Sequence, residues 1–207
     1  MARYTGADCK LCRREKTKLF LKGAKCDSPK CPIEIRPYPP GEHGRNRPKE
    51  GDYLQQIREK QKARRIYGIL EKQFRNMYEE ASRQPGITGE NLLRNLELRL
   101  DNVVFRAGWG ASRSQARQFV RHGHVQVNGR RVTIPSYRVR TGDKVTLRES
   151  TRGNFQVRRN MDTLERQTPA WLAPGDSGFS VDVLNPPLRE HIDEPVQEQL
   201  IVELYSK

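Results

Sequence analysis

The stretch from Leu98 to Glu149 constrains the fold most, because helix, turn and hairpin signals follow one another closely within it. Leu100, Val103 and Val104 recur at helical spacing, and Gly108 then ends the helix that they predict. The stretch is also strongly basic, since arginines and lysines recur from residue 106 to residue 148. Like charges at this density repel one another unless an anion neutralises them. We therefore expect a folded unit that faces an anionic partner.

A second helix is predicted to start at Ser112. Ser112 followed three residues later by Gln115 is typical of a capping box, and Gly123 is suited to end the helix. The apolar positions expected to form its buried stripe are Ala116, Phe119 and Val120.

An arginine stripe is expected on another face of this second helix. Arg113, Arg117 and Arg121 are spaced four residues apart, and no carboxylate lies between them in the sequence. The alternative is a solvated helix face, which is the commoner explanation of an isolated stripe. The missing counter-charges and the basic hairpin that follows favour contact with RNA.

A hairpin and a further strand complete the stretch. Val125–Val127 alternate toward Asn128-Gly129, the strongest short hairpin signal, and Val132 and Ile134 are expected on the return strand. A turn at Thr141–Asp143 then leads into another strand. The stretch therefore predicts two short helices backed by a small β-sheet.

Composition favours a protein lodged among phosphates over an enzyme. The 207 residues include 39 Lys and Arg against 25 Asp and Glu, a net charge of +14, and 34% are hydrophobic. No histidine is paired with a plausible nucleophile and no glycine-rich phosphate loop occurs, so no catalytic site is predicted. No apolar run approaches the ~20 residues of a membrane helix, and we expect a cytosolic protein.

The four cysteines indicate a metal site near the N-terminus, because they form two close pairs separated by a loop. The predicted ligands are Cys9, Cys12, Cys26 and Cys31. One structural Zn²⁺ is expected, with an iron–sulfur cluster as the alternative, since the ligand types are the same. The alternatives without a metal are two disulfides, which are disfavoured in a reducing cytosol, and four unremarkable thiols. Basic residues within the loop predict a metal-stapled arm laid on phosphates.

Two helices are predicted between this arm and the basic stretch. A long helix capped by Asp52 is expected to run to about Ser82, where Pro85-Gly86 ends it. Thr88 is expected to cap the second helix. These helices would form the body of a first domain.

Several runs of the chain resemble a known family in the same order. The runs that resemble the S-four RNA-binding module are Arg99–Val104, Ser114–Gln118, Val120–Val125 and Val127–Gly129. That module also occurs in RNA-modifying enzymes. The flanking runs that resemble the bacterial small-subunit ribosomal protein S-four family are Arg36–Gly41, Glu59–Arg64 and Glu198–Glu203. The resemblance covers nearly the whole chain and is weakest between residues 154 and 185.

The resemblance implies an α+β fold in which the basic module is inserted into a mainly helical domain. The apolar face of residues 196–207 would complete the first domain, 1–97, and the second domain would span 98–195. Alternation from Phe179 to Leu184 predicts a strand closing the second domain.

The resemblance also implies a structural constituent of the small ribosomal subunit. Such a protein binds ribosomal RNA early, nucleates assembly of the subunit body, contributes to translational accuracy and in some bacteria represses its own messenger. Its expected partners are ribosomal RNA, proteins of the S-five and S-three families, and messenger RNA where it enters the ribosome, with no membrane and no small-molecule substrate. The alternatives are an RNA-modifying enzyme that borrows the module, which would need a further catalytic domain, and a free RNA chaperone.

The residues expected to contact RNA lie in the arm, in the first long helix and in the basic module. They are Arg13, Arg14, Lys22, Arg45, Arg47, Lys60, Lys62, Arg64, Arg65, Ser112, Arg113, Gln115, Arg117, Arg121, His124, Arg130 and Arg131.

Overall fold

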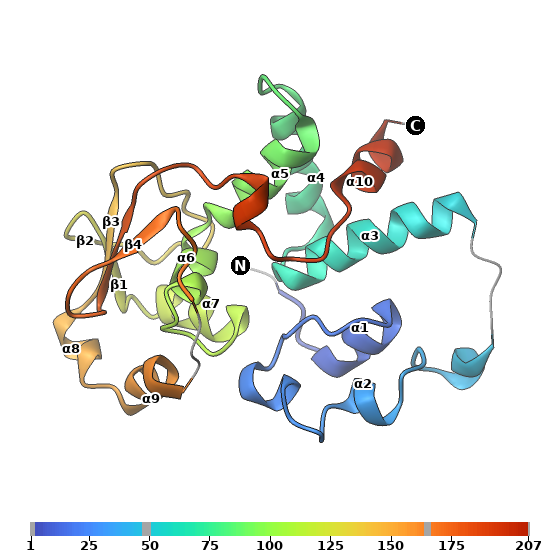
Figure 1. The fold of residues 1–207 in the computed structure, drawn as a ribbon, viewed down its shortest axis with the longest axis horizontal. Coiled ribbons are helices and arrows are strands. Elements are labelled where there is room, and N and C mark those ends of the chain that lie inside the picture. The colour runs from blue at the N-terminus through green and yellow to red at the C-terminus, as the bar shows by residue number, and fades with distance from the viewer. Residues whose placement is uncertain (1–2, 47–50, 164–166, 207) are drawn as a thin grey trace. The chain divides into compact units, whose positions relative to one another are not determined.

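The computed structural model describes residues 3–46, 51–163 and 167–206. The chain divides into two compact units, Met1–Leu92 together with Glu194–Lys207, and Leu93–Asp193. We call these the first unit and the second unit; Figure 1 shows the elements of each. The fold class is α+β, as predicted, because helices dominate the first unit and an antiparallel sheet lies in the second.

The first unit consists of helices. They are α1 (Asp8–Glu15), α2 (Pro32–Ile35), α3 (Asp52–Ile66), α4 (Glu71–Ser82), the first part of α5 (Thr88–Glu97), α10 (Glu198–Tyr205), and the 3₁₀ helices Gly23–Cys26 and Glu42–Arg45. We call residues 3–46, which hold α1, α2 and both 3₁₀ helices, the arm.

The prediction of one long helix from Asp52 to Ser82 is wrong. The chain leaves α3 after Ile66 and starts α4 at Glu71. Gly68 lies between them with φ of +63°, a left-handed conformation that glycine adopts without strain and that ends a helix. Asp52 is the first residue of α3 rather than its cap.

The C-terminal helix packs on α3 within the first unit. Ile201 is fully buried there, and Gln56 Nε2 donates to Glu203 Oε2 at 2.9 Å. The rings of Tyr78 and Tyr205 stack with centroids 4.5 Å apart. The last residues of the chain therefore close the core of the unit in which the chain begins.

The second unit combines a helix pair with a five-stranded antiparallel sheet of order β2-β1-β3-β5-β4. Its elements are the end of α5, α6 (Leu100–Arg106), α7 (Arg113–Arg121), β1 (Val125–Val127), β2 (Arg130–Arg131), β3 (Lys144–Leu147), α8 (Glu149–Arg152), α9 (Phe155–Thr163), β4 (Leu172–Pro174), β5 (Ser180–Val183) and the 3₁₀ helix Arg189–His191.

The predicted turn chemistry of this unit is confirmed. Ser112 caps α7, and Gly123 follows the helix with φ of +72°. Asn128 and Gly129 both have positive φ, +50° and +77°, as a type I′ hairpin turn requires. The return strand is shorter than predicted, since β2 ends at Arg131 and Ile134 is 55% exposed.

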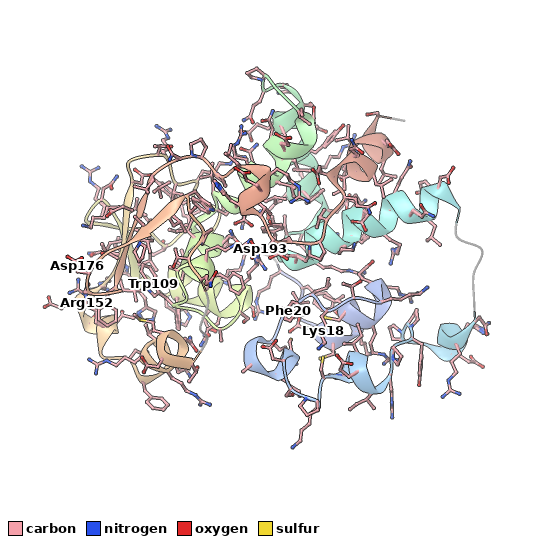
Figure 2. The ribbon with its side chains drawn as sticks, in the orientation of Figure 1. Lys18, Phe20, Trp109, Arg152, Asp176 and Asp193 are labelled. Carbon is pink, nitrogen blue, oxygen red and sulfur yellow. The ribbon has the colours of Figure 1, made fainter. Side chains whose placement is uncertain are left out.

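The core of the second unit lies between the helix pair and the sheet. Ala116, Phe119 and Val120 are buried in it, as predicted for α7. Trp109, labelled in Figure 2, is fully buried and donates its indole N–H to the Gly178 carbonyl at 2.8 Å. This core fixes α7 and the hairpin, and so it fixes the basic side chains that they carry.

Candidate nucleic-acid interface

The expectation that no carboxylate neutralises the arginines of α7 is wrong for Arg117. This side chain is buried, and its Nη1 lies 2.9 Å from Asp101 Oδ2 on α6. Arg99 holds the same carboxylate through two hydrogen bonds of 3.0 and 2.7 Å. Two guanidiniums therefore share one buried carboxylate, and Arg117 acts as a link between α6 and α7.

Arg113 belongs to a second polar network of the helix pair. Its Nε donates to Asn102 Oδ1 at 2.8 Å, and its guanidinium carbon lies 4.3 Å from the centroid of the Phe105 ring. Asn102 in turn donates to Glu97 Oε2 at 2.8 Å, and Arg106 Nε donates to the same oxygen at 3.0 Å. The sequence run from Arg99 to Arg106 thus serves the fold of the module.

Ser112 and Gln115 also serve the fold. Ser112 Oγ accepts the Gln115 N–H at 3.3 Å, while Gln115 Oε1 accepts the Ala111 N–H at 2.7 Å. Asn160 on α9 donates to the same Gln115 oxygen at 3.1 Å. The first of these bonds satisfies the N–H of the third residue of α7, and together the bonds engage both side chains that were expected to contact RNA.

Exposed cations lie at the end of α7 and at the hairpin. Arg121, Arg130 and Arg131 are exposed. Arg131 Nη2 donates to the His122 carbonyl at 3.3 Å, and its guanidinium covers Gly123, where a Cβ would lie 2.0 Å from Arg131 Nε. No ion pair joins Arg121 or Arg130 to a carboxylate among the residues that the structure describes.

His124 lies beside these cations and is half-buried. Its Nδ1 lies 3.0 Å from Thr151 Oγ1. Burial lowers its pKa, and the neighbouring His122 lowers it further. His124 is therefore neutral at physiological pH and adds no charge to the surface.

The four cations predicted on α3 are engaged within the first unit. Lys60 is buried and lies 2.7 Å from Glu71, and Arg64 lies 3.3 Å from the same carboxylate. Lys62 pairs with Glu59 and donates to the Pro195 carbonyl at 3.1 Å. Arg65 pairs with Glu15. Prediction from the sequence missed two of these partners, Glu71 and Glu15, because both lie outside α3.

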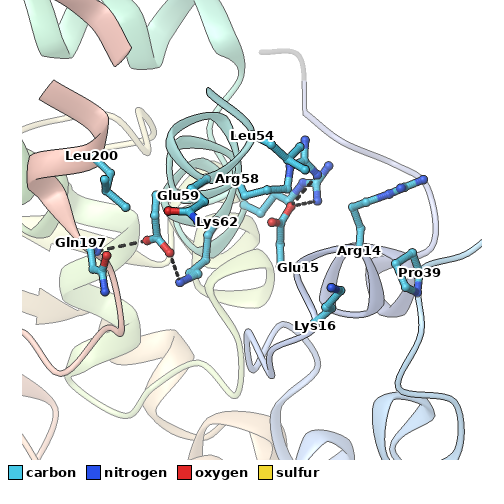
Figure 3. Close-up of a pocket in the computed structure, with 12 residues that line it drawn as sticks. Arg14, Glu15, Lys16, Pro39, Leu54, Arg58, Glu59, Lys62, Gln197 and Leu200 are labelled. Atoms are coloured by element: carbon cyan, nitrogen blue, oxygen red, sulfur yellow. Dashed lines mark hydrogen bonds and ion pairs between the residues drawn. The ribbon is translucent and has the colours of Figure 1, made fainter. Parts of the chain in front are cut away.

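Glu15 joins the arm to α3. Figure 3 shows its carboxylate directed at Arg58, which lies 3.4 Å away. The same carboxylate also pairs with Arg65. Its side chain is 1% exposed, and this burial raises its pKa, although Arg65 and Arg58 oppose the shift. The cavity beside this pair has a volume of about 610 Å³ and is lined by both α1 and α3.

The arm carries exposed cations that were predicted to contact RNA. Arg14, Lys22 and Arg45 are exposed, and Arg13 is half-buried. Arg47, also predicted to contact RNA, lies outside the described residues. Sequence reasoning passed over Tyr38, whose ring has both the Arg13 and the Arg45 guanidinium carbon 5.1 Å from its centroid.

The four cysteines are free thiols of the arm. Cys12, Cys26 and Cys31 are buried and Cys9 is half-buried. Burial raises the pKa values of Cys12 and Cys26, and the Lys22 N–H donates to Cys26 Sγ at 3.3 Å. Within the described ranges, no three metal-binding side chains come together closely enough to hold an ion. The predicted metal knuckle is not seen, although four thiols are a donor set that suits Zn²⁺.

A helix pair on a small antiparallel sheet, with exposed arginines at one helix end and one hairpin, defines an RNA-binding module. The family model described as S4 domain matches residues 98–145. This is the stretch whose sequence resembles the S-four RNA-binding module. The model described as Ribosomal protein S4/S9 N-terminal domain matches residues 3–97. No helix among the described residues is long and apolar enough to cross a membrane.

Relatives match the chain over its full length. Proteins named small ribosomal subunit protein uS4 are 66% identical in Acidothermus cellulolyticus, 64% in Frankia alni and 57% in Pelotomaculum thermopropionicum. Each match covers 100% of both sequences. The chain belongs to the ribosomal protein S4 family.

Proposed function

We propose that this protein is a structural constituent of the small ribosomal subunit, where it binds ribosomal RNA in the cytoplasm. The observation that carries this proposal is full-length identity of 57 to 66% to proteins of that name in three organisms. The exposed cations of the arm and of the S4 domain supply the phosphate contacts that such binding needs.

The S4-family resemblance supports finer roles. We propose that the protein nucleates assembly of the subunit body and contributes to accurate decoding. Repression of its own messenger, a role of the family in some bacteria, is proposed as well. Its neighbours are the S-five and S-three proteins, and messenger RNA enters nearby. We propose that the protein has two domains. The first comprises residues 1–97 and is completed by residues 196–207, and the second comprises residues 98–195.

The proposed RNA contacts are those of the predicted cations that remain accessible. In the arm and in the S4 domain these are Arg13, Arg14, Lys22, Arg45, Arg113, Arg121, Arg130 and Arg131. We leave out Arg117 and Lys60, because both are buried against carboxylates. Neutralising phosphates releases counterions, so binding weakens steeply as salt increases.

We also propose that Cys9, Cys12, Cys26 and Cys31 hold one Zn²⁺, with an iron–sulfur cluster as the alternative. Four cysteines in one arm, three of them buried, supply the thiolate donor set that Zn²⁺ prefers, and this supports the proposal. Elemental analysis and optical spectra of the purified protein test this: one zinc per chain is expected, whereas acid-labile sulfide would indicate a cluster and no metal would refute the proposal.

The ribosomal assignment is tested by sedimentation of native cell extract through a sucrose gradient. The protein is expected in the small-subunit and 70S fractions, and a high-salt wash should release it. A protein that stays at the top of the gradient would instead be a free RNA chaperone. An RNA-modifying enzyme is disfavoured because the full-length relatives carry the name of a ribosomal subunit protein.

A further inference from the structure

We propose that Tyr38 and the arginines around it form a binding site for the backbone phosphates of RNA, a site in which the aromatic ring holds the guanidiniums in place. This inference rests on the proposed function and assigns a role to a residue that carries no charge.

Two guanidiniums that are distant in the sequence lie beside the Tyr38 ring. The Arg13 and Arg45 guanidinium carbons each lie 5.1 Å from the ring centroid, within the range of a cation–π contact. Arg45 also hydrogen-bonds the Tyr38 hydroxyl, and together with Arg36 and Arg13 it lowers the pKa of that phenol. Three positive charges therefore lie around one ring.

Backbone contacts fix this arrangement. Arg13 Nε donates to the Arg36 carbonyl at 3.1 Å and to the Tyr38 carbonyl at 3.0 Å. Gly44 brings Arg45 back to the ring: a Cβ at Gly44 would lie 2.0 Å from the Pro39 carbonyl oxygen and 3.4 Å from Tyr38 Cδ2. Only glycine permits this close return of the chain.

Among the residues that the structure describes, no carboxylate pairs with Arg13, Arg36 or Arg45. Lys18 takes the nearby Glu34 at 2.6 Å, and within the described part of the chain no ion pair joins Glu42 or any other acid to the three arginines. The arginines repel one another, so an external anion lowers the free energy of the arrangement. Guanidiniums match phosphate geometry, and their positions are set before binding, which reduces the entropy cost.

The test measures binding of the full-length protein to small-subunit ribosomal RNA as a function of salt concentration. Tyr38→Leu removes no charge, yet it is expected to weaken binding and to reduce the magnitude of the log–log salt slope by about 0.7–0.9 for each phosphate that the arginines no longer neutralise. Tyr38→Phe, which keeps the ring, should retain most of the slope.

A double-mutant cycle then separates the site from general charge. Arg45→Gln should reduce the slope, and adding Tyr38→Leu to Arg45→Gln should reduce it by less than Tyr38→Leu does alone, because the two residues act together. The matched controls are Tyr53→Leu, at a tyrosine that is 63% exposed on α3, and Lys25→Gln, at an exposed arm lysine outside the cluster. Tyr53→Leu should leave the slope unchanged, and Lys25→Gln should combine additively with Tyr38→Leu.

Two outcomes would overturn the proposal. If Tyr38→Leu leaves both the RNA affinity and the salt slope unchanged, the ring only packs within the arm. If binding weakens and the slope is unchanged, the ring stacks on an RNA base and does not position the arginines. Circular dichroism and thermal unfolding of each variant exclude unfolding of the arm as the cause. If the parent protein failed to bind ribosomal RNA at all, the proposed function would fail first, and the two failures are therefore distinguishable.

Discussion

Helix α3 and the hairpin of the S4 domain carry similar clusters of cations, but the structure uses them differently. On α3, Lys60 and Arg65 are covered by carboxylates from α4 and from the arm. At the hairpin, Arg130 and Arg131 project from a two-residue strand and are exposed. A helix in the middle of a unit has neighbours on several sides that can supply acids, whereas a hairpin tip has few. Position in the fold, rather than local charge density, therefore decides which cations can reach RNA.

The largest effect is expected where a buried carboxylate holds two arginines. Asp101→Ala would leave Arg99 and Arg117 buried without their partner, which should lower the free energy of unfolding by about 3–5 kcal/mol. Denaturant unfolding measures this. The matched control is Glu79→Ala, at an exposed i,i+4 pair with Arg75, which should change stability by less than about 0.5 kcal/mol. Equal effects of the two changes would refute the structural role of Asp101.

Lys60→Met tests the paired cations of α3. Glu71 would lose its hydrogen bond to Lys60, so we expect a decrease of about 1–3 kcal/mol in the free energy of unfolding. The salt slope of RNA binding should not change, because Lys60 is already neutralised. A reduced salt slope with unchanged stability would show that Lys60 contacts RNA. Lys60 would then not differ from the hairpin arginines.

Arg121→Ala and Arg130→Ala test the exposed cations. Each should reduce the magnitude of the salt slope by about 0.7–0.9 and change the free energy of unfolding by less than about 0.5 kcal/mol. Arg117→Ala should show the opposite pattern. It should lower the free energy of unfolding, and the salt slope of RNA binding should be unchanged under conditions in which the variant is folded. Titration of ribosomal RNA at several salt concentrations, with unfolding curves for each variant, provides both readouts.

The smallest effect concerns pH and His124. Because its pKa is lowered in the folded protein, the unfolded chain binds its proton more readily below about pH 6.5. Stability should therefore fall as pH drops from that value toward the folded pKa, and it should recover as pH rises. His124→Gln should remove this part of the pH dependence, and urea unfolding between about pH 5 and pH 7.5 measures it. An identical pH profile in the variant would show that other groups cause it.

Local features of this protein were determined by short segments of sequence. The Ser112 cap, the turn at Asn128-Gly129 and the helix end at Gly123 each depend on residues within a few positions of one another. Backbone conformation and hydrogen bonding at such distances are set by the residues themselves, so these predictions were correct. The same rule applied to Gly68 would have separated α3 from α4.

Charge pairing was decided only by the tertiary structure. Asp101 is 16 residues from Arg117, and Glu15 is 50 residues from Arg65. Nothing in the spacing of α7 shows that α6 places a carboxylate against it. Tyr38 likewise meets Arg13, which is 25 residues away in the sequence, only through the folding of the arm. A sequence specifies the charges of a chain, but their electrostatic energy depends on distance and burial, and packing alone sets these.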